Sequence, residues 1–193
     1  MKRRMLMTAM LVATGLVTTS AGRIAFSHDR GPEDGDQSRI RKGLAIAPVK
    51  LTYHPRNREW VGLGSYIVNA QGACNDCHTC PSYAKGGFPY AGQKTLINKA
   101  NYLAGGTPFG PFQSANVTPD ATGKPAGLSF GDFLMVMHKG HNPNDPPGEI
   151  LPVMPWPIYG NMTDHDLRAV YEFLRAIPPA QPGSCAGPSE PTP

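Results

Sequence analysis

Three stretches of the chain place apolar residues at the spacing of a helix. The first runs from Arg58 to Gln71 and is apolar mainly along one face. The residues that share this face are Trp60, Leu63, Ile67 and Ala70. Gly62 and Gly64 lie within the stretch and are poor helix formers, but they allow a second helix to approach closely. The pattern therefore predicts one helix over residues 58–71 with a close helical neighbour.

Two later stretches begin with a capping signal. Residues 129–132 read Ser-Phe-Gly-Asp, the spacing of a capping box, which predicts a helix that runs to about Lys139 and stops at Gly140. Thr163 repeats this signal ahead of an amphipathic helix that ends before Pro178. The side chains of this helix that we expect to point inward are Leu167, Val170, Tyr171 and Leu174.

The remaining segments show no such period. Residues 22–43 are polar and acidic with a Gly-Pro pair, which predicts a flexible segment. Residues 81–125 are irregular and rich in Gly and Pro, and wrapping the edge of a cofactor is one of the few good reasons for so long a stretch. Residues 179–193 form a Pro-rich tail that we expect to be mobile. One folded domain is therefore expected over residues 44–178.

The first residues of the chain have the pattern of an export signal. Residues 2–4 are basic, Met5 to Val17 is apolar, and the small residues 19–21 offer a cleavage site. The apolar run is short for a membrane span. We therefore expect a cleaved signal peptide over residues 1–21, with an uncleaved membrane anchor as the alternative. Either outcome places the protein in the periplasm or cell envelope.

Removal of this signal changes the charge of the chain. The whole sequence carries 18 Lys and Arg against 14 Asp and Glu, a net charge of +4. The predicted signal contains three of the basic residues and no acidic ones, so the other 172 residues have a net charge of +1. A chain this close to neutral does not indicate nucleic-acid binding or a polybasic membrane patch.

Five consecutive residues carry the chemistry of the chain: Cys74-Asn75-Asp76-Cys77-His78. This C-x-x-C-H motif is the attachment signature of a c-type haem. The two thiols can each add to one vinyl group of the porphyrin, and His78 follows at once as the proximal iron ligand. A bare C-x-x-C also fits half a zinc site or a redox disulfide, but the adjacent histidine favours haem. One motif predicts one covalent haem.

The second axial ligand is sought among four methionines outside the signal. Met135 and Met137 lie inside a predicted helix, where core packing is expected, and Met162 lies at a helix start. Met154 lies in the loop 151–157, which three prolines stiffen, so that its thioether is presented at little entropic cost. We therefore predict Met154 as the distal iron ligand.

Histidines offer the alternative to a methionine ligand. His138 and His141 are the candidates, although their Lys-Gly-Asn-Pro surroundings suggest solvent exposure. The histidines expected to be structural or superficial are His28, His54 and His165. Because the chain shows no convincing nucleophile–base pair, we predict an electron carrier rather than an enzyme. A haem enzyme or gas-binding protein stays open as the alternative and requires an open sixth site, with His138 or His141 as distal acid–base group.

Two further cysteines, Cys80 and Cys185, lie outside the motif. In an oxidising compartment they are expected to form a disulfide, with two unpaired thiols as the alternative. A remote alternative is an iron–sulfur protein that uses all four cysteines: Cys74, Cys77, Cys80 and Cys185. In that alternative the fourth cysteine would lie at the wrong place for the cysteine spacing of bacterial ferredoxins, and His78 would have no role.

Taken together, these residues resemble those of class I cytochromes c, and in particular the cytochrome c domains of membrane-bound alcohol and sugar dehydrogenases. The resemblance covers about residues 58–178. The similar stretches are Gly64 to Ala70, Leu103 to Gly110, Asn116 to Asp120, the Met-Pro loop and Asp164 to Leu174. It implies an all-α fold, in which helices surround one haem with long irregular loops. The first and last helices should cross, with Tyr66 and Phe173 near the contact.

The same resemblance implies roles and partners. Cys74 and Cys77 would carry the thioethers, and His78 and Met154 would bind the iron. The loop 116–120, Asn-Val-Thr-Pro-Asp, would lie along the haem edge. The protein would shuttle one electron from a dehydrogenase or other donor to a respiratory acceptor such as a terminal oxidase. Its partners would be redox proteins, without nucleic acid, and with membrane anchoring only through an uncleaved signal.

Overall fold

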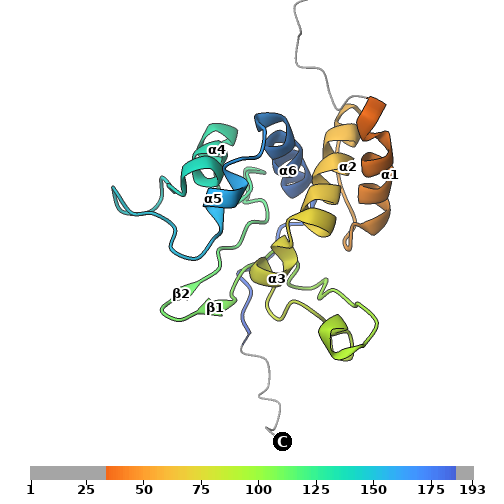
Figure 1. Ribbon diagram of the computed structural model, residues 1–193, viewed down its shortest axis with the longest axis horizontal. Helices are drawn as coiled ribbons and strands as arrows, with labels where there is room; N and C mark the ends of the chain where they lie inside the picture. Colours follow the sequence, from red (N-terminus) through yellow and green to blue (C-terminus); the bar gives the residue numbers. More distant parts are fainter. Residues whose placement is uncertain (1–33, 186–193) are drawn as a thin grey trace, which may run out of the picture. The chain divides into compact units, whose positions relative to one another are not determined.

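The computed structural model describes residues 34–185 (Figure 1), so the predicted signal peptide lies outside the described residues. Within this range the chain is mostly helical, with a small two-stranded antiparallel sheet that pairs Phe109 with Phe112. The elements are α1 (Gln37–Ile46), α2 (Arg58–Tyr66), α3 (Cys74–His78), β1 (Pro108–Phe109), β2 (Phe112–Gln113), α4 (Phe130–Lys139), α5 (Trp156–Tyr159) and α6 (Asp164–Ala176). No helix in this range has both the length and the apolar character needed to cross a membrane.

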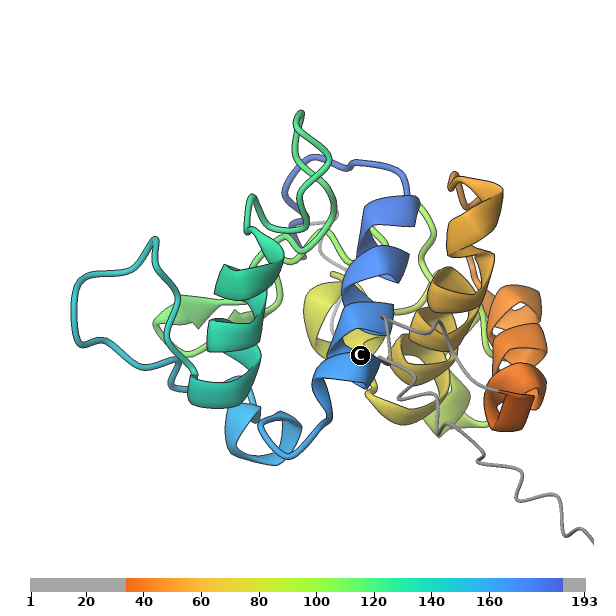
Figure 2. The same cartoon turned by 90° about the horizontal axis from the view of Figure 1, so that it is seen from above.

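Helix α2 packs against α6, and the two lie side by side in both views (Figure 1, Figure 2). α2 continues into a π-helical turn, Ile67–Gln71, so the helix predicted over residues 58–71 is confirmed. A methyl group at Gly64 would overlap the carbonyl of Ala169 and crowd the Cβ of Phe173. The missing side chain of Gly64 therefore sets how closely the helices approach, and Phe173 lies at their contact as the resemblance implied.

Helix α1 corrects the prediction that residues 22–43 are flexible, since it starts at Gln37 and packs on α2. Ile40 is fully buried, and the Ser65 hydroxyl donates a hydrogen bond to the Gly43 carbonyl at 2.7 Å. Tyr66, expected at the α2–α6 contact, has its backbone nitrogen and Cβ beside Gly43. The helix was missed because it buries only Ile40 and Gly43 and is otherwise polar or partly exposed.

The caps of α4 and α6 form as predicted. The Ser129 hydroxyl accepts a hydrogen bond from the Asp132 amide at 3.2 Å, and the Asp132 carboxylate accepts one from the Ser129 amide at 3.3 Å. Gly140 ends α4 in the left-handed conformation, with φ of 68°. In α6 the Thr163 hydroxyl accepts from the Asp166 amide at 3.1 Å. The four residues expected to point inward from α6 are buried: Leu167, Val170, Tyr171 and Leu174.

The start of the Pro-rich tail is bound to the domain, which corrects its predicted mobility over residues 179–185. Cys80 and Cys185 form the predicted disulfide, with their Cα atoms 4.9 Å apart. The Gly183 amide donates to the Ala104 carbonyl at 2.7 Å. This segment was missed because its partners are backbone groups and a distant cysteine, which leave no local pattern in a Pro-rich stretch.

Candidate haem site

The attachment residues lie in α3, a single helical turn that follows the π-helical turn. Cys74 and Cys77 are three residues apart, so their side chains project from the same side of the turn, and neither forms a disulfide. Ala73 precedes them in the left-handed conformation, with φ of 49°. The Tyr159 hydroxyl of α5 donates to the Gly72 carbonyl at 2.8 Å. The chain is therefore fixed at the entry to α3 by a contact from a helix far along the sequence.

One hydrogen bond indicates which ring nitrogen of His78 carries the proton. Its Nδ1 lies 2.8 Å from the backbone carbonyl oxygen of Ala115. Because a carbonyl only accepts, Nδ1 carries the proton, and the lone pair on Nε2 is available to a metal. Burial lowers the pKa of His78, which also favours the neutral, ligating form. These residues fit a haem iron, whose proximal histidine needs this tautomer and orientation.

The two thiols also fit attachment rather than thiolate chemistry. Burial raises the pKa of Cys74 to about 12, and burial followed by the negative charge of Asp76 raises the pKa of Cys77. Both effects favour the neutral thiol over the thiolate. Cys80 and Cys185 are bonded to each other, so the iron–sulfur alternative is wrong. Residues 34–185 also contain no group of three or more His, Cys, Asp or Glu side chains arranged to bind a metal ion.

Met154 lies in a loop that is anchored at both ends. It is half-buried and packs against the same apolar core as Cys74. Before it, the Leu151 amide donates to the Gly140 carbonyl at 2.9 Å, and after it the Trp156 amide donates to the Met154 carbonyl at 2.7 Å. Beyond the loop, Tyr159 contacts the attachment turn, and its pKa is raised by burial and by the nearby cysteines. This framework suits an axial ligand, and the role of Met154 stays a prediction.

The two alternative histidine ligands differ: His138 has both ring nitrogens engaged, whereas His141, like His78, has its Nδ1 bonded to a backbone carbonyl. The Nδ1 of His138 lies 2.9 Å from the Gly160 carbonyl, and its Nε2 lies 2.9 Å from a carboxylate oxygen of Asp164. With both ring nitrogens bonded, His138 has none left for iron or for distal acid–base work. The Nδ1 of His141 bonds to the Glu149 carbonyl at 3.0 Å.

The other three histidines were expected to be structural or superficial. The exposed His54 accepts a hydrogen bond from the Arg56 amide at 3.3 Å, which caps a short turn. The ring of His165 lies 4.8 Å from that of Trp60. Both match the expectation, and His28 lies outside the described residues.

The remaining methionines divide between core and surface. Met137 is buried, as predicted, and Met162 packs against the core from the start of α6. Met135 was also expected in the core, but 43% of its surface is exposed. It lies two residues from Met137, and positions two apart on a helix do not share a face.

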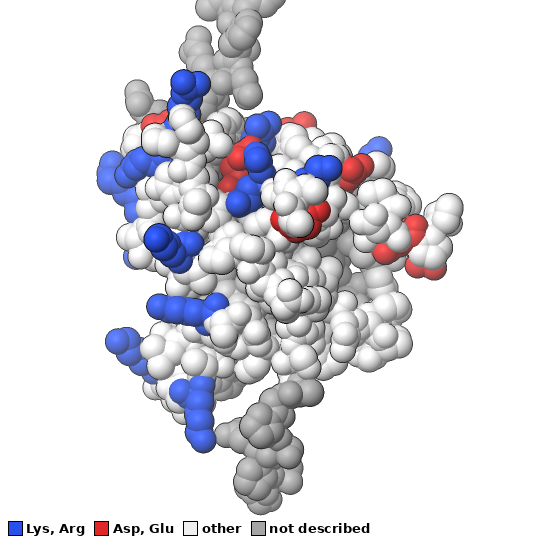
Figure 3. Space-filling view, turned by 180° about the vertical axis from the view of Figure 1, so that it is seen from behind, with Lys and Arg blue, Asp and Glu red and all other residues white. Residues whose placement is uncertain are grey.

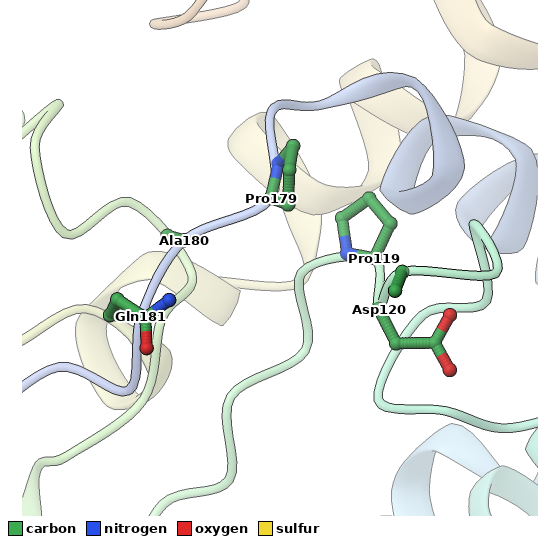
Figure 4. Close-up of a pocket in the computed structure, with 6 residues that line it drawn as sticks. Pro119, Asp120, Pro179, Ala180 and Gln181 are labelled. Carbon is green, nitrogen blue, oxygen red and sulfur yellow. The ribbon is translucent and has the colours of Figure 1, made fainter.

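The loop 116–120 is held against the tail. The side-chain amide of Asn116 donates to the Ala180 carbonyl at 2.8 Å, and the backbone amide of Ala180 donates to the Thr118 hydroxyl at 3.1 Å. An open surface hollow lies between loop and tail (Figure 4), lined by Pro119, Asp120, Ala121, Pro179, Ala180 and Gln181. It contains no residue of the attachment motif, and the position of this loop along a haem edge stays a prediction.

Comparison with curated proteins finds relatives that are cytochrome subunits. The chain is 34% identical to the gluconate 2-dehydrogenase cytochrome c subunit of Pantoea cypripedii over 125 residues, which are 64% of this chain and 24% of the relative. It is 30% identical to the cytochrome c subunit of the quinone alcohol dehydrogenase of Gluconobacter oxydans over 111 residues, 58% of this chain and 20% of the relative. The chain resembles these cytochrome c subunits.

A third relative of this cytochrome type is the fructose dehydrogenase cytochrome subunit of Gluconobacter japonicus, 24% identical over 131 residues, 66% of this chain and 23% of the relative. The matched part thus spans at most about a quarter of each of these three cytochrome subunits. No family model and no solved structure matches the chain.

Several residues around the cytochrome motif could not be found from the sequence. The carbonyl of Ala115 is a backbone group, so no side chain signals its role. Tyr102 lies beside Cys74, and its hydroxyl donates to the Asn69 side-chain oxygen at 2.6 Å. A tyrosine is a common core residue, and Tyr102 and Tyr159 reach the motif only through the tertiary fold.

Proposed function

We propose that this protein is a single-haem c-type cytochrome that carries electrons in the periplasm or cell envelope. The observation that carries the proposal is the hydrogen bond from His78 Nδ1 to the Ala115 carbonyl, which leaves Nε2 free in a turn that also carries two cysteines outside any disulfide. Haem bound there supplies an iron that accepts and releases one electron. The names of the relatives support this class of function.

The residues of the chain have separate tasks in this proposal. Cys74 and Cys77 hold the cofactor through thioethers, and His78 supplies the proximal ligand. The bond to Ala115 keeps the imidazole in one tautomer and raises its basicity as a ligand. Met154 supplies the distal ligand, and a thioether there raises the reduction potential relative to a second histidine. With both axial positions filled, the site is that of an electron carrier rather than of an enzyme.

The partners follow from the relatives. Because those proteins are cytochrome subunits of gluconate, alcohol and fructose dehydrogenases, we propose a dehydrogenase as the electron donor. A terminal oxidase or other respiratory component would be the acceptor. An uncleaved signal would anchor the protein at the membrane, and a cleaved one would release it.

Covalent attachment is the direct test of this function. The chain should be expressed with a cytochrome c maturation system and extracted with acidified acetone, which removes haem that is not covalently bound. We expect the colour to stay with the protein and mass spectrometry to show one haem per chain. The double variant Cys74→Ala, Cys77→Ala should lose its colour to the solvent, while Cys80→Ser, Cys185→Ser should keep it. Colour that leaves the unaltered protein would refute the proposal.

A further inference from the structure

Residues 82–99, called the aromatic loop below, follow the attachment motif and form an ordered hairpin-like excursion. The Ala84 amide donates to the Leu96 carbonyl at 2.8 Å, and the Asn98 amide donates to the Ser82 carbonyl at 3.2 Å. At the tip the Phe88 amide donates to the Gln93 side-chain oxygen at 2.8 Å. The loop carries the small helical turn visible beyond α3 in Figure 1. Its shape is therefore fixed before any partner arrives, which reduces the entropy cost of binding.

The aromatic loop exposes apolar side chains that the core does not use. Tyr90 is 74% exposed and Phe88 49%, and their ring centroids lie 5.5 Å apart. Leu96, on the opposite arm, is 42% exposed. Clustered exposed aromatic residues on an ordered loop are typical of a protein-binding surface.

Two tyrosines of the aromatic loop are bonded to the attachment turn. The Tyr83 hydroxyl donates to one carboxylate oxygen of Asp76 at 2.7 Å, and the Tyr90 hydroxyl lies 3.3 Å from the other. Asp76 stands between Cys74 and Cys77. One side chain therefore separates the exposed aromatic cluster from the peptide that would hold the haem.

The charged side chains of the aromatic loop itself are all basic. From residue 77 to residue 119 the sequence contains no Asp or Glu and three lysines, Lys85, Lys94 and Lys99. All three are exposed, and none forms an ion pair within the described part of the chain. Figure 3 shows Lys and Arg along the edge formed by α1 and the aromatic loop, with the acidic side chains mostly elsewhere.

We propose that the aromatic loop is the docking site for a redox protein with an acidic surface. Phe88 and Tyr90 would anchor the contact, and the three lysines would steer the partner toward it. The proposal rests on the function proposed above, because the aromatic loop is useful for electron transfer only if the attachment turn beside it holds a haem. The bonds of Tyr83 and Tyr90 to Asp76 place the loop close to the haem attachment turn. This closeness matters to a redox partner, but not to a lipid surface or a second copy of the chain.

The test uses the haem-loaded full chain and flavodoxin, a small acidic one-electron donor, as the probe. Binding of oxidised flavodoxin is measured by NMR titration at several salt concentrations, and electron transfer from reduced flavodoxin is measured by stopped flow. In the variant Lys85→Glu, Lys94→Glu, Lys99→Glu we expect affinity and rate to fall by about tenfold or more at low salt. In Phe88→Ser, Tyr90→Ser we expect weaker binding with the salt dependence retained.

Matched variants separate the loop from general effects. Lys50→Glu, Lys124→Glu, Lys139→Glu makes the same change of net charge on exposed lysines elsewhere, and Phe112→Ser, Ile150→Ser removes side chains of similar exposure, 49% and 51%. Both should bind flavodoxin nearly as the unaltered protein does. The rate of reduction by ascorbate should be equal in all variants, which would show that the haem is still redox-active in each. An unaltered protein without covalent haem would refute the proposed function and would be recognised before any docking measurement.

Three outcomes would overturn the docking proposal. The first is that the loop variants equal the unaltered protein in affinity and rate, and the second is that the matched charge variant loses as much as the loop variant. Alternatively, the loop variants could lose binding to phosphatidylglycerol vesicles, or lose a dimer seen by sedimentation, while flavodoxin binding is unchanged. Those last results would assign the loop to a membrane or to a second copy of the chain.

Discussion

At the scale of single residues, the ability of a histidine to bind iron depends on which of its ring nitrogens already form hydrogen bonds. His78 has Nδ1 bonded to a carbonyl 37 residues away, so only Nε2 is available as a ligand. His138 has both ring nitrogens bonded, so it is unavailable. Residue type alone would treat the two histidines alike, and their hydrogen bonds separate a candidate iron ligand from a histidine that joins α4 to Gly160 and Asp164.

The first prediction concerns Met154. Replacement by Ala should remove the thioether, so the Met–iron charge-transfer band should vanish from the ferric spectrum, and carbon monoxide should bind to the ferrous protein. The reduction potential should fall, because a soft ligand that disfavours ferric iron is lost. Met137→Ala is the control: it should keep the native spectrum and lower the free energy of unfolding by about 2–5 kcal/mol. A native spectrum in Met154→Ala would show that another group binds the iron.

The second prediction concerns the pH dependence of folding. Both oxygen partners of His138 require N–H donors, so the structure contains the protonated imidazole, and these bonds raise the pKa of His138 above its usual value. Its contribution to stability is therefore complete below about pH 6.5, the unfolded pKa, and is lost as the pH rises through the higher folded pKa. The free energy of unfolding, compared at pH 5.5 and 8.5, should fall less in His138→Gln than in the unaltered protein. An unchanged difference in His138→Gln would contradict the assignment.

At the scale of elements, the α2–α6 contact depends on one glycine. Gly64→Ala would drive a methyl group into the carbonyl of Ala169, and we expect the free energy of unfolding to fall by about 1–3 kcal/mol or more. Gly131→Ala in α4 is the matched control, because its Cβ would meet only the Ser129 hydroxyl oxygen at 3.9 Å. That variant should be neutral or more stable by roughly 0.5–1 kcal/mol. Equal chemical denaturation curves for the two variants would show that the helices can separate without cost.

The helices that could be predicted are those with two agreeing local signals. The helix over residues 58–71 has a clear apolar face, and those that follow Ser129 and Thr163 have caps that form as expected. Helix α1 has no side-chain hydrogen bond at its N-cap and buries Ile40 and Gly43, so its stability comes from α2 rather than from its own pattern. The β1–β2 hairpin has two residues per strand, too few for an alternating pattern to show.

At the scale of the whole molecule, the disulfide is the largest single constraint. Cys80 and Cys185 are 105 residues apart, so by the loop-entropy model their bond destabilises the unfolded chain by roughly 4–5 kcal/mol. Cys80→Ser, Cys185→Ser should therefore unfold at lower guanidinium concentration while keeping the haem spectrum. Peptide mapping without reductant should recover the linked pair from the unaltered protein. Identical unfolding midpoints, or two thiols free to alkylate, would contradict this prediction.

The candidate site was predictable only where its residues are adjacent in sequence. Cys74, Cys77 and His78 form a recognisable motif because the chemistry of attachment fixes their spacing. The bonds from Tyr159 to Gly72 and from His78 to Ala115 join segments far apart in the chain. Such contacts follow from how the loops fold back on α3, and no spacing rule relates their positions.

The disulfide also has a consequence for the order in which the protein matures. Cys74, Cys77 and Cys80 are spaced three apart, so before folding Cys80 is a closer neighbour of Cys77 than of Cys185. In the exported chain proposed here, oxidation that comes too early would join the wrong thiols and remove one that the haem needs. The correct pair can form only after residue 185 has crossed the membrane. Folding of the tail onto Ala104 then brings Cys185 to Cys80 and leaves the two attachment cysteines as the reduced pair. In a chain exported and loaded with haem as proposed, the late position of Cys185 would thus delay the structural disulfide relative to the appearance of the attachment cysteines.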